Sequence, residues 1–553
     1  MIAARLTPPP EPSTQDRLMS TAYPSPISDN DRAGGVLGLQ PGPAADAGAA
    51  WVISAHGERA VAHASQERLD RIKHSNAYPS DAMAACRSAL GLPEHARPAL
   101  VARVAGGGAT FAPPHFGNVA QLDVEHALCH AAAGYYCSPF DEAAILVVDG
   151  HRRDQGARHA SQSVWIARGE RIEEVARSTS CGIGALYEAV TQAIGFGARE
   201  TGKTMGLAPY GDPARAPVFR GRFEGLNVDY SDDCDAHGSR LFHAPPLPDD
   251  AARAALAYAA QRECERAMLH LARTVRAMTG MRRLCLAGNV SLNGRANDLV
   301  WRAAGFDAVF AGPAGADCGT SLGAALWGWH GVLGEPFRPG PFSPYGGRPY
   351  DLASVAAALA AMPPHLRYRE TRGTPAQLAA QAARLLAAGR CVALHAGRGE
   401  IGPRALGNRS LLMSPERASA RERMNLDVKR REAFRPFAPC VPAEDAARYF
   451  ELDLPSPYML RICAVRPAWR ARLAAVTHVD GTARPQTVSQ QDNPGFHALL
   501  RAFERETGMA VLLNTSFNVA GEPLVESPAD ALRGFAQNDI DALLIGERLL
   551  EKI

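Results

Sequence analysis

Two α/β domains joined by an irregular linker are the fold class that this sequence predicts. From residue 34 onward, short apolar stretches typical of strands alternate with helical segments, which is the pattern of α/β folds. The strands predicted in residues 142–150 and 282–297 run into polar residues, as strands do at the ligand-binding edge of an open α/β sheet. Residues 334–351 are dense in proline and glycine, which indicates a linker. We therefore expect domains over residues 34–340 and 346–553.

Length and composition limit the function classes. A chain of 553 residues is long enough for roughly two to four domains. Its formal charge is only +2, so no general attraction to nucleic acid or to an anionic membrane is expected. No apolar stretch reaches the roughly 20 residues that span a bilayer, and the N-terminus lacks the signal-peptide pattern, so we expect a cytoplasmic protein. The 11 cysteines include no C-x-x-C motif, which argues against a disulfide framework and a cysteine zinc site.

The predicted elements follow one another in a simple order. Residues 1–33 are rich in proline, serine and threonine without apolar periodicity, and we expect them to be disordered. "GGVLGLQPG" (34–42) predicts a strand, and residues 49–74 predict a strand, a glycine turn, a second strand and the start of a helix. Beyond the linker, the alanine-rich stretch 376–390 predicts a helix that leads to a strand at 391–397. A second α/β unit therefore begins there.

A pair of histidines marks a candidate metal site. His126 and His130 in "VEHALCH" are four residues apart, so on a helix their rings project from one face and can converge on one ion. Packed or surface histidines are the alternative. Asp149 ends a predicted buried strand and Asp317 lies in a loop of small residues, and buried carboxylates need a partner. Two histidines with two aspartates form a nitrogen and oxygen set suited to iron, manganese or zinc.

The glycine-rich loop around Asp317 has a second interpretation. Gly319 and its neighbouring glycines let the backbone come close to a ligand, and Thr320 and Ser321 near a helix start offer donors to a phosphate. Close packing of the loop against a helix is the alternative.

Two further stretches are candidates for contact with a nucleotide. Asn289, Asn293 and Asn297 recur at four-residue spacing and could line one helix face toward a ribose or base, although capping and turn formation would explain them as well. Lys203 and Thr204 lie between glycines in residues 200–213, but the spacing is not that of a phosphate-binding P-loop.

Lysine is scarce in this chain. Only Lys73, Lys203, Lys429 and Lys552 among the 59 basic residues are lysine. The bias is typical of a GC-rich genome that uses arginine wherever arginine suffices. A retained lysine therefore indicates a position where a compact point charge must approach an oxygen atom.

The motifs, taken together, resemble a known family. "VEHALCH", "LVVDG", "GKTMGLAPYG", "GNVSLNGRAN" and "PAGADCGTSLGAA" are similar to the N-terminal domain of O-carbamoyltransferases that act on antibiotics and nodulation factors. That domain is related to the universal tRNA threonylcarbamoyl transferase and has an actin/Hsp70/sugar-kinase type of fold. "GEIGPRALGNRSLLMSP", "DVKRREAFRPFAP", "THVDGTARPQTV" and "LLNTSFNVAGEPLVESPADAL" resemble the family's YrdC-like C-terminal domain. The resemblance runs from about residue 34 to the end.

The resemblance implies two coupled reactions. Carbamoyl phosphate and ATP, the latter with Mg²⁺, would form carbamoyl-adenylate and pyrophosphate in the C-terminal domain. The carbamoyl group would then pass, in the N-terminal domain, to a hydroxyl of a small-molecule acceptor such as a natural product or sugar, releasing AMP. Enclosure of both sites would limit hydrolysis of the labile intermediate. Neither nucleic acid nor membrane is an expected partner, and a homodimer remains open.

The resemblance also implies roles for individual residues. Iron, as Fe(II), would be the divalent metal held by His126, His130, Asp149 and Asp317. Asp46 would be the general base for the acceptor hydroxyl. Carbamoyl phosphate, ATP and the adenylate would be bound by Lys203, Asn289, Asn293, Gly319, Arg404, Lys429, Arg431, Arg435, Asn514, Ser516 and Asn518. Arg404, Lys429 and Arg435 would act directly in adenylation, where arginine forks hold phosphate and Lys429 acts as a point charge. His478, Asp480 and Arg484 match family positions without an independent chemical role.

Two departures and three alternatives complete the sequence-based hypothesis. Ala45 stands where the family has histidine before Asp46, and Asn289 stands where glycine is usual; asparagine tolerates a positive φ, so the loop could survive. A hydrogenase-maturation carbamoyltransferase shares both domain types, but its cysteine zinc modules have no counterpart in this sequence. A tRNA threonylcarbamoylation enzyme is disfavoured by the balanced charge. A non-catalytic nucleotide-binding module is disfavoured by the intact set of basic residues.

Overall fold

The computed structural model of the chain describes residues 34–42, 46–55, 57–105, 116, 118–150, 160–363 and 366–553. The tail predicted to be disordered, residues 1–33, lies outside these described residues, as does Ala45. Within them the chain is a mixed α/β protein, which confirms the predicted fold class.

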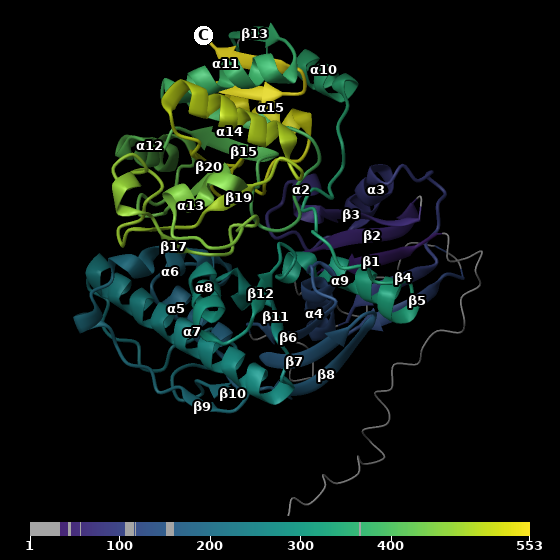
Figure 1. Ribbon diagram of the computed structural model, residues 1–553, viewed down its shortest axis with the longest axis vertical. Coiled ribbons are helices and arrows are strands. Elements are labelled where there is room, and N and C mark those ends of the chain that lie inside the picture. Colours follow the sequence, from purple (N-terminus) through teal and green to yellow (C-terminus); the bar gives the residue numbers. More distant parts are fainter. Residues whose placement is uncertain are drawn as a thin grey trace, which may run out of the picture.

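The N-terminal half contains two five-stranded sheets in its described part (Figure 1). The first has the order β3 (Glu58–Ser65), β2 (Gly48–Ala55), β1 (Val36–Gln40), β4 (Leu100–Val104), β5 (Ala120–Val124). The second has the order β8 (Arg171–Ser178), β7 (Gln162–Arg168), β6 (Glu142–Val148), β11 (Arg283–Ala287), β12 (Ala308–Ala311). In each sheet an antiparallel meander of three strands is followed by two strands that run parallel to the first. This duplicated arrangement is that of the predicted actin/Hsp70/sugar-kinase class.

Strand β6 is buried on both faces, which explains its continuous apolar sequence. Ala143, Ile145 and Val147 pack into a core shared by the two sheets, whereas Ala144 and Val148 face the core on the opposite side. Because successive side chains of a strand point to opposite faces, both sets must be apolar. Asp149 directly follows this strand, so its side chain is positioned at the centre of the fold.

Helices occupy both faces of the second sheet (Figure 1). The helices α4 (His126–Tyr136) and α9 (Thr320–Leu326) pack together between the two sheets. Their approach is close, because a Cβ at Gly323 would lie 1.9 Å from the carbonyl oxygen of Cys129. The helices α5 (Ile183–Ala193), α7 (Asp250–Thr279) and α8 (Gly294–Ala303) cover the other face of the second sheet. The helix α3 (Ser80–Ala89) covers the outer face of the first sheet.

The described C-terminal part is built on one eight-stranded mixed sheet. Its order is β13 (Tyr368–Arg372), β22 (Arg548–Lys552), β21 (Ala542–Ile545), β14 (Val392–His395), β15 (Arg409–Met413), β20 (Leu512–Ser516), β16 (Ala438–Pro442), β19 (Gln486–Val488). Helix α11 (Pro375–Ala387) packs against α14 (Pro494–Thr507), and α10 (Leu352–Ala360) packs against α15 (Pro528–Gln537). The alanine-rich helix begins at a capping box of Thr374 and Gln377, near its predicted start. Assignment of this domain to the YrdC-like class stays a prediction.

Shorter elements fill the connections of both halves. They are α2 (Gln66–Asp70), α6 (Thr201–Leu207), β9 (Arg222–Glu224), β10 (Asn227–Asp229), α12 (Ala418–Arg423), α13 (Ala446–Tyr449), β17 (Cys463–Ala464) and β18 (Thr482–Ala483). Residues 334–351, predicted as a linker, contain no helix or strand and are all described. They are nevertheless held in place, since Tyr345 Oη donates to the carbonyl of Leu406 at 2.9 Å. No helix of the described residues is both long and apolar enough to cross a membrane.

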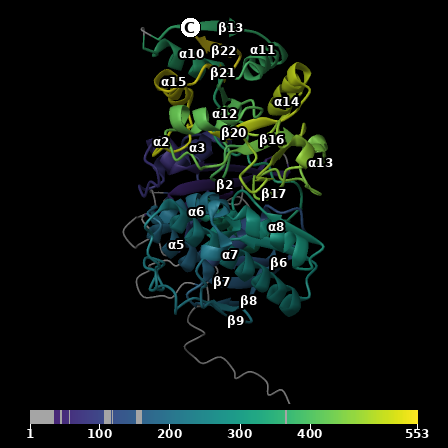
Figure 2. The same ribbon diagram turned by 90° about the vertical axis from the view of Figure 1, so that its left-hand side faces the viewer.

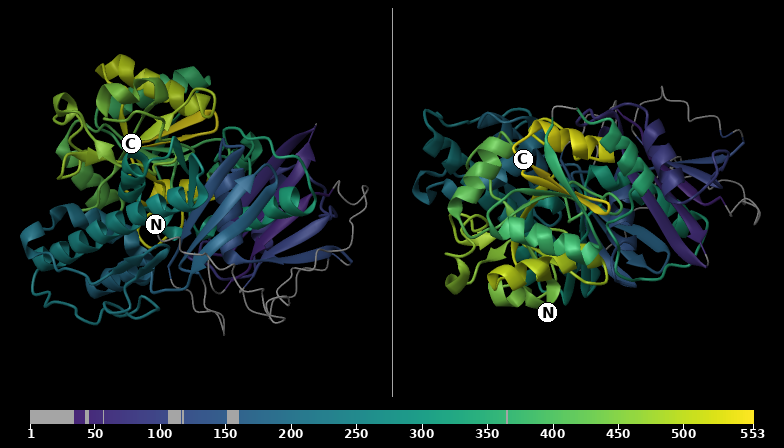
Figure 3. Two further views of the ribbon diagram at one scale, coloured as in Figure 1. Left: turned by 60° about the horizontal axis from the view of Figure 1, so that its bottom comes forward. Right: turned by 90° about the horizontal axis from the view of Figure 1, so that it is seen from above.

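The C-terminal domain sits directly on the N-terminal half (Figures 2 and 3). Arg68 after β3 donates to the carbonyls of Glu400 and Gly402 at 2.6 and 2.7 Å. On the opposite side of the contact, Arg295 of α8 pairs with Asp480 at 2.5 Å. The loops that carry the predicted sites of the two halves therefore meet in one interface.

Candidate active site

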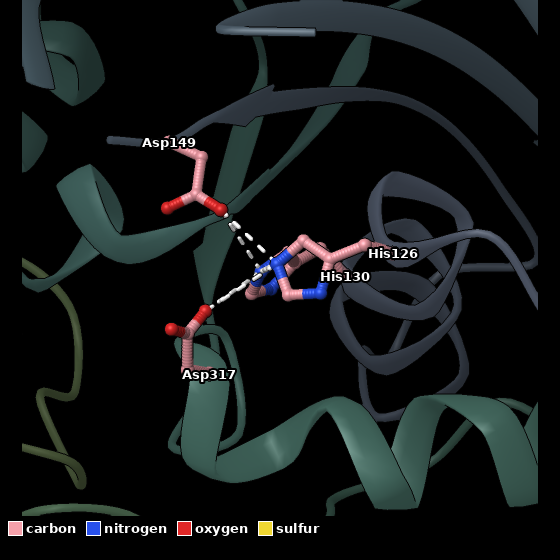
Figure 4. Close-up of side chains that lie close together, drawn as sticks. All are labelled: His126, His130, Asp149 and Asp317. Carbon is pink, nitrogen blue, oxygen red and sulfur yellow. Dashed lines mark hydrogen bonds and ion pairs between the residues drawn. The ribbon is translucent and has the colours of Figure 1, made fainter. Parts of the chain in front are cut away.

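The four predicted metal-ligating side chains converge on one point (Figure 4). His126 and His130 project from one face of α4, Asp149 follows β6, and Asp317 begins the 3-10 turn Asp317–Gly319 before α9. The two Nε2 atoms are 2.9 Å apart. Each lies 3.2 to 3.4 Å from Asp149 Oδ2 and from Asp317 Oδ1. The four-residue spacing on α4 and the end of β6 thus bring these side chains to one point, as the sequence led us to expect.

This arrangement fits a small transition-metal ion. Ligands bonded at about 2.0 to 2.1 Å are separated by about 2.9 Å at right angles and by about 3.3 Å in a tetrahedron. The separations of 2.9 to 3.4 Å in the cluster fall in this range. His130 Nδ1 faces the carbonyl of Gly315 at 2.9 Å, so it carries the proton and leaves Nε2 with a lone pair. The cluster is a possible metal-binding site for one divalent ion.

The shifted pKa values within the cluster also favour the binding of a cation. Burial would lower the pKa of His130, but hydrogen bonds to Asp149 and Asp317 outweigh it and raise the pKa to about 9. Burial and the charge of Asp317 would raise the pKa of Asp149, yet the bonds from the two histidines hold it well below its usual range. Protons therefore neutralise the cluster when no cation does, and a bound cation would release them.

Asn289 connects the two carboxylate ligands. Its backbone N–H lies 3.3 Å from Asp149 Oδ1, and its own Oδ1 accepts from the backbone N–H of Asp317 at 3.1 Å. Asn289 does not have to use the positive φ that asparagine tolerates, because the left-handed residue of this loop is Gly288, with φ at 83°. A Cβ at Gly288 would lie 2.2 Å from the carbonyl oxygen of Val148, so glycine is required there instead.

The other N-terminal candidates are held by the protein itself. A Cβ at Gly319 would lie 2.0 Å from the carbonyl of Ala314, which supports the close-packing interpretation of this loop. Asn293 caps α8 through the N–H of Ala296 and exchanges amide hydrogen bonds with Gln261, which supports the capping interpretation. The three asparagines do not share a helix face, because Asn289 lies in the 3-10 turn Asn289–Leu292 ahead of the cap. Contact of Gly319, Asn289 or Asn293 with a nucleotide stays a prediction.

Lys203 of α6 joins the two halves. Its Nζ lies 2.7 Å from Glu200 and 2.6 Å from Glu432 of the C-terminal domain. Two carboxylates compensate its charge, so a phosphate would have to replace one of them.

Lys429 lies at the centre of the predicted C-terminal site. Its Nζ is within 2.6 Å of the Ser516 carbonyl and of both the carbonyl and Oδ1 of Asn518, and 3.1 Å from Ser516 Oγ. The side chain is buried, and no carboxylate balances its charge among these contacts. Burial, together with Arg431 and Arg435, holds the pKa of Lys429 well below its ordinary value. The structure thus brings the predicted lysine, serine and asparagine together.

Arginines surround this lysine. Burial and Arg435 lower the pKa of Arg404 to about 10 and that of Arg431 to about 9. Arg484, after β18, is a fourth member, since burial and the charges of Arg404, Arg431 and Arg435 hold its pKa well below the ordinary value. Partly buried cations that repel one another favour the binding of an anion, and the carboxylate of Glu432, 3.8 Å from Arg435, balances only part of their charge. The cluster therefore has the charge of a site for a polyanion.

Asn514 lies at the edge of the same site. It donates to Gln486 Oε1 at 2.7 Å and lies 3.3 Å from the carbonyl of Ala405, the residue after Arg404. The Nε of Arg404 is buried and has no hydrogen-bond partner in the described part of the chain. The site thus retains donor capacity for a ligand.

Inorganic pyrophosphate should stabilise the protein through this cluster. The Arg484→Met variant should bind pyrophosphate about 10-fold more weakly or worse, because one charge-assisted hydrogen bond is worth about 1.5 to 3 kcal/mol. The rise of Tm with pyrophosphate concentration measures the affinity. The exposed Arg505 offers a matched control, and Arg505→Met should behave as the unmodified protein. An unchanged titration for Arg484→Met would remove Arg484 from the site.

Asp46 lies beside His74, a residue that the sequence did not single out as part of a site. Asp46 Oδ1 is 2.9 Å from His74 Nδ1 and 3.5 Å from Arg199. Asp46, Glu67 and His74 also form a second group close enough to hold an ion. No motif or spacing relates positions 46 and 74, so only the fold could show this contact. Arg484, by contrast, lay in a motif that the sequence had already singled out.

The comparisons with known proteins are consistent across both halves. Residues 118–326 match a family model described as carbamoyltransferase N-terminus, and residues 383–552 match one described as carbamoyltransferase C-terminus. The nodulation protein NolNO of Sinorhizobium fredii is 34% identical over 89% of this chain and 77% of its own length. A 3'-hydroxymethylcephem-O-carbamoyltransferase of Streptomyces clavuligerus is 33% identical over 64% of this chain and 65% of its own length. Among solved structures, T. kodakarensis HypF aligns with a TM-score of 0.34 and 14% identity, over 54% of this chain and 48% of that one.

Proposed function

The chain belongs to the carbamoyltransferase family, and on that premise we propose that it is an ATP-dependent O-carbamoyltransferase with a small-molecule acceptor. It is a transferase, and members of the family include enzymes named for transfer to a cephem hydroxyl. In the proposed reaction, carbamoyl phosphate is first hydrolysed to carbamate and inorganic phosphate. A carbamate oxygen then attacks the α-phosphorus of ATP, which gives carbamoyl-adenylate and releases pyrophosphate. A hydroxyl of the acceptor then takes the carbamoyl group and AMP leaves.

The C-terminal cation cluster is the proposed site of adenylation. Two polyanions, ATP and carbamoyl phosphate, must approach each other there, and Mg²⁺ would accompany the ATP. Arg404, Arg431, Arg435 and Arg484 would hold phosphate oxygens through paired N–H groups, and Lys429 would act as a point charge. Their repulsion in the free protein supports this role, because ligand binding relieves it. The site would stabilise the negative charge that develops as pyrophosphate leaves.

The N-terminal cluster is the proposed site of transfer. His126, His130, Asp149 and Asp317 would hold a divalent ion, for which we propose iron. Such an ion would supply a Lewis acid for the carbamoyl oxygen. Asp317 and Asp149 are oriented by Asn289, so the loop that holds the ion is pre-organised.

Direct contact between the two loops supports passage of the intermediate from one site to the other. A Cβ at Gly402, two residues before Arg404, would lie 2.3 Å from the carbonyl of Pro313 in the loop that leads to Asp317. Arg404 also lies close to Cys318, the residue after Asp317. The residues that pack between the halves at this point include Leu292, Pro313, Ile401, Arg404 and Tyr458. A labile adenylate formed beside Arg404 would therefore have only a short distance to travel to the N-terminal site.

The convergence of four partly buried arginines around the buried Lys429, whose own contacts include no carboxylate, is the observation that carries the proposal. The test is the product pattern with ATP, Mg²⁺ and ¹³C-labelled carbamoyl phosphate, with a 3'-hydroxymethylcephem as the probe alcohol. We expect AMP and pyrophosphate, with the label in a carbamate ester of the probe or, if the probe does not fit, in carbamate released to water. One inorganic phosphate from carbamoyl phosphate should accompany each AMP, whereas ADP in place of AMP and pyrophosphate would contradict adenylation.

A further inference from the structure

Asp46 and His74 form an acid and imidazole pair that two loops hold together. The Nδ1 of His74 is 2.9 Å from Asp46 Oδ1, and Glu67 Oε2 accepts from the backbone N–H of His74 at 2.9 Å. The N–H of Ala47 donates to the carbonyl of Ser75 at 3.0 Å and ties the two loops side by side. His74 has a φ of 57°, a left-handed conformation that non-glycine residues rarely adopt. Conformations of this kind persist where the surroundings enforce them, often at functional sites.

The pair lies between the two sites described above. On one side, Lys73 is close enough to Lys429 for its charge to lower the pKa of that lysine. On the other side, Thr320, three residues after Asp317, donates to Gln40 Oε1 at 2.9 Å, at the end of the strand that leads to Asp46. Arg68, between Asp46 and His74 in the chain, donates to the carbonyls of Glu400 and Gly402 just before Arg404. The segments that carry the pair thus contact the loops of both proposed sites.

We propose that His74 is the general base that deprotonates the acceptor hydroxyl, and that Asp46 positions it. The inference rests on the proposed function and changes the role expected for Asp46. An aspartate at Nδ1 fixes the proton on that nitrogen and leaves the Nε2 lone pair free to accept another. The Nε2 of His74 has no hydrogen-bond partner among the described residues. The sequence has alanine at position 45, so this imidazole comes from a distant loop.

The proposed step balances as follows. The acceptor oxygen forms a bond to the carbamoyl carbon of carbamoyl-adenylate while its proton passes to His74 Nε2. The bond between that carbon and the AMP phosphate oxygen breaks, and the electron pair leaves with AMP. The imidazolium is stabilised by Asp46 and returns its proton to water.

A second metal site is the competing explanation for the same residues. Asp46, Glu67 and His74 are near enough to share an ion. However, Arg199 lies 3.5 Å from Asp46 Oδ1, and Lys73 directly precedes His74 in the chain. Two neighbouring cations repel a divalent ion, which favours the acid and base role.

The test compares His74→Ala, His74→Asn and the exposed control His95→Ala. Asparagine tolerates the left-handed backbone and can keep the bond to Asp46, but it cannot accept the proton. Each variant is assayed for carbamoyl-phosphate-stimulated ATP/pyrophosphate exchange, for single-turnover release of AMP with water and methanol as probe hydroxyls, and for metal content. Exchange reports the C-terminal site and shows that the variant is folded.

We expect exchange and metal content to be unchanged in all three variants. Release of AMP should fall about 10²-fold or more in both His74 variants, and added imidazole should restore part of it in His74→Ala. Normal release in both variants would overturn the proposal, and normal release in His74→Asn alone would reduce His74 to a structural role. Loss of a bound metal ion in the His74 variants would overturn the proposal in favour of a second metal site at Asp46, Glu67 and His74. Absence of stimulated exchange in the unmodified protein would overturn the proposed function, and the role of His74 with it.

Discussion

Replacing Lys429 by alanine should lower carbamoyl-phosphate-stimulated ATP/pyrophosphate exchange by about 10³-fold, the range seen when one pre-organised donor to a developing charge is removed. Nζ is held within 3.1 Å of four oxygens of Ser516 and Asn518, so the ammonium is fixed where phosphate would bind. Lys429→Arg should not restore exchange, because the planar guanidinium is too large for this buried position. Radiolabelled pyrophosphate incorporated into ATP measures the effect.

Lys552 provides the control for this variant. It is another of the four lysines, and its Nζ donates to the carbonyl of Asn538 at 2.6 Å, in the strand β22 away from the cation cluster. Lys552→Ala should keep full exchange. More than a tenth of the normal exchange in Lys429→Ala would contradict the central place given to this lysine.

Replacing His130 by alanine should remove the metal and stop transfer while leaving exchange intact. His130 is fully buried, and its Nδ1 contact with Gly315 fixes the nitrogen that faces Asp149 and Asp317. Loss of one of four ligands should reduce the metal content from roughly one ion per chain to near zero, because the remaining three do not close the site. Release of AMP in a single turnover should fall by at least about 10²-fold.

The exposed His243 is the matched control, and His243→Ala should keep both metal and transfer. Elemental analysis of the purified variants reports the metal without depending on activity. Loss of exchange together with transfer in an otherwise folded His130→Ala would show that the two reactions share one site, against the division proposed between the halves.

The cluster of His126, His130, Asp149 and Asp317 could be predicted from the sequence because its members carried local signals. The spacing of His126 and His130 requires only a helix, and a charged residue such as Asp149 directly after a continuous apolar strand requires a partner. The duplicated sheet then brings the helix, the strand end and the loop of Asp317 together. Lys429 was identified by a different signal, the scarcity of lysine in the chain.

Contacts between distant loops could not be predicted in the same way. Asp46 meets His74 only because the loops at Ala47 and Ser75 are hydrogen bonded, and no periodicity records that contact. The link that Asn289 makes between the two aspartates was not predicted for a related reason: it depends on the positive φ of the preceding Gly288, which only the backbone reveals. The pairing of Lys203 with Glu432 likewise depends on how the two halves dock.

The most direct test of the central claim, that the C-terminal half forms carbamoyl-adenylate and the N-terminal half transfers the carbamoyl group, is exchange by the unmodified full chain after its metal has been removed by a chelator and Mg²⁺ restored. We predict that carbamoyl phosphate stimulates ATP/pyrophosphate exchange as strongly as in the untreated protein, while AMP release is lost until a divalent transition metal is added back. Exchange that carbamoyl phosphate does not stimulate, or that disappears with the metal, would contradict the claim.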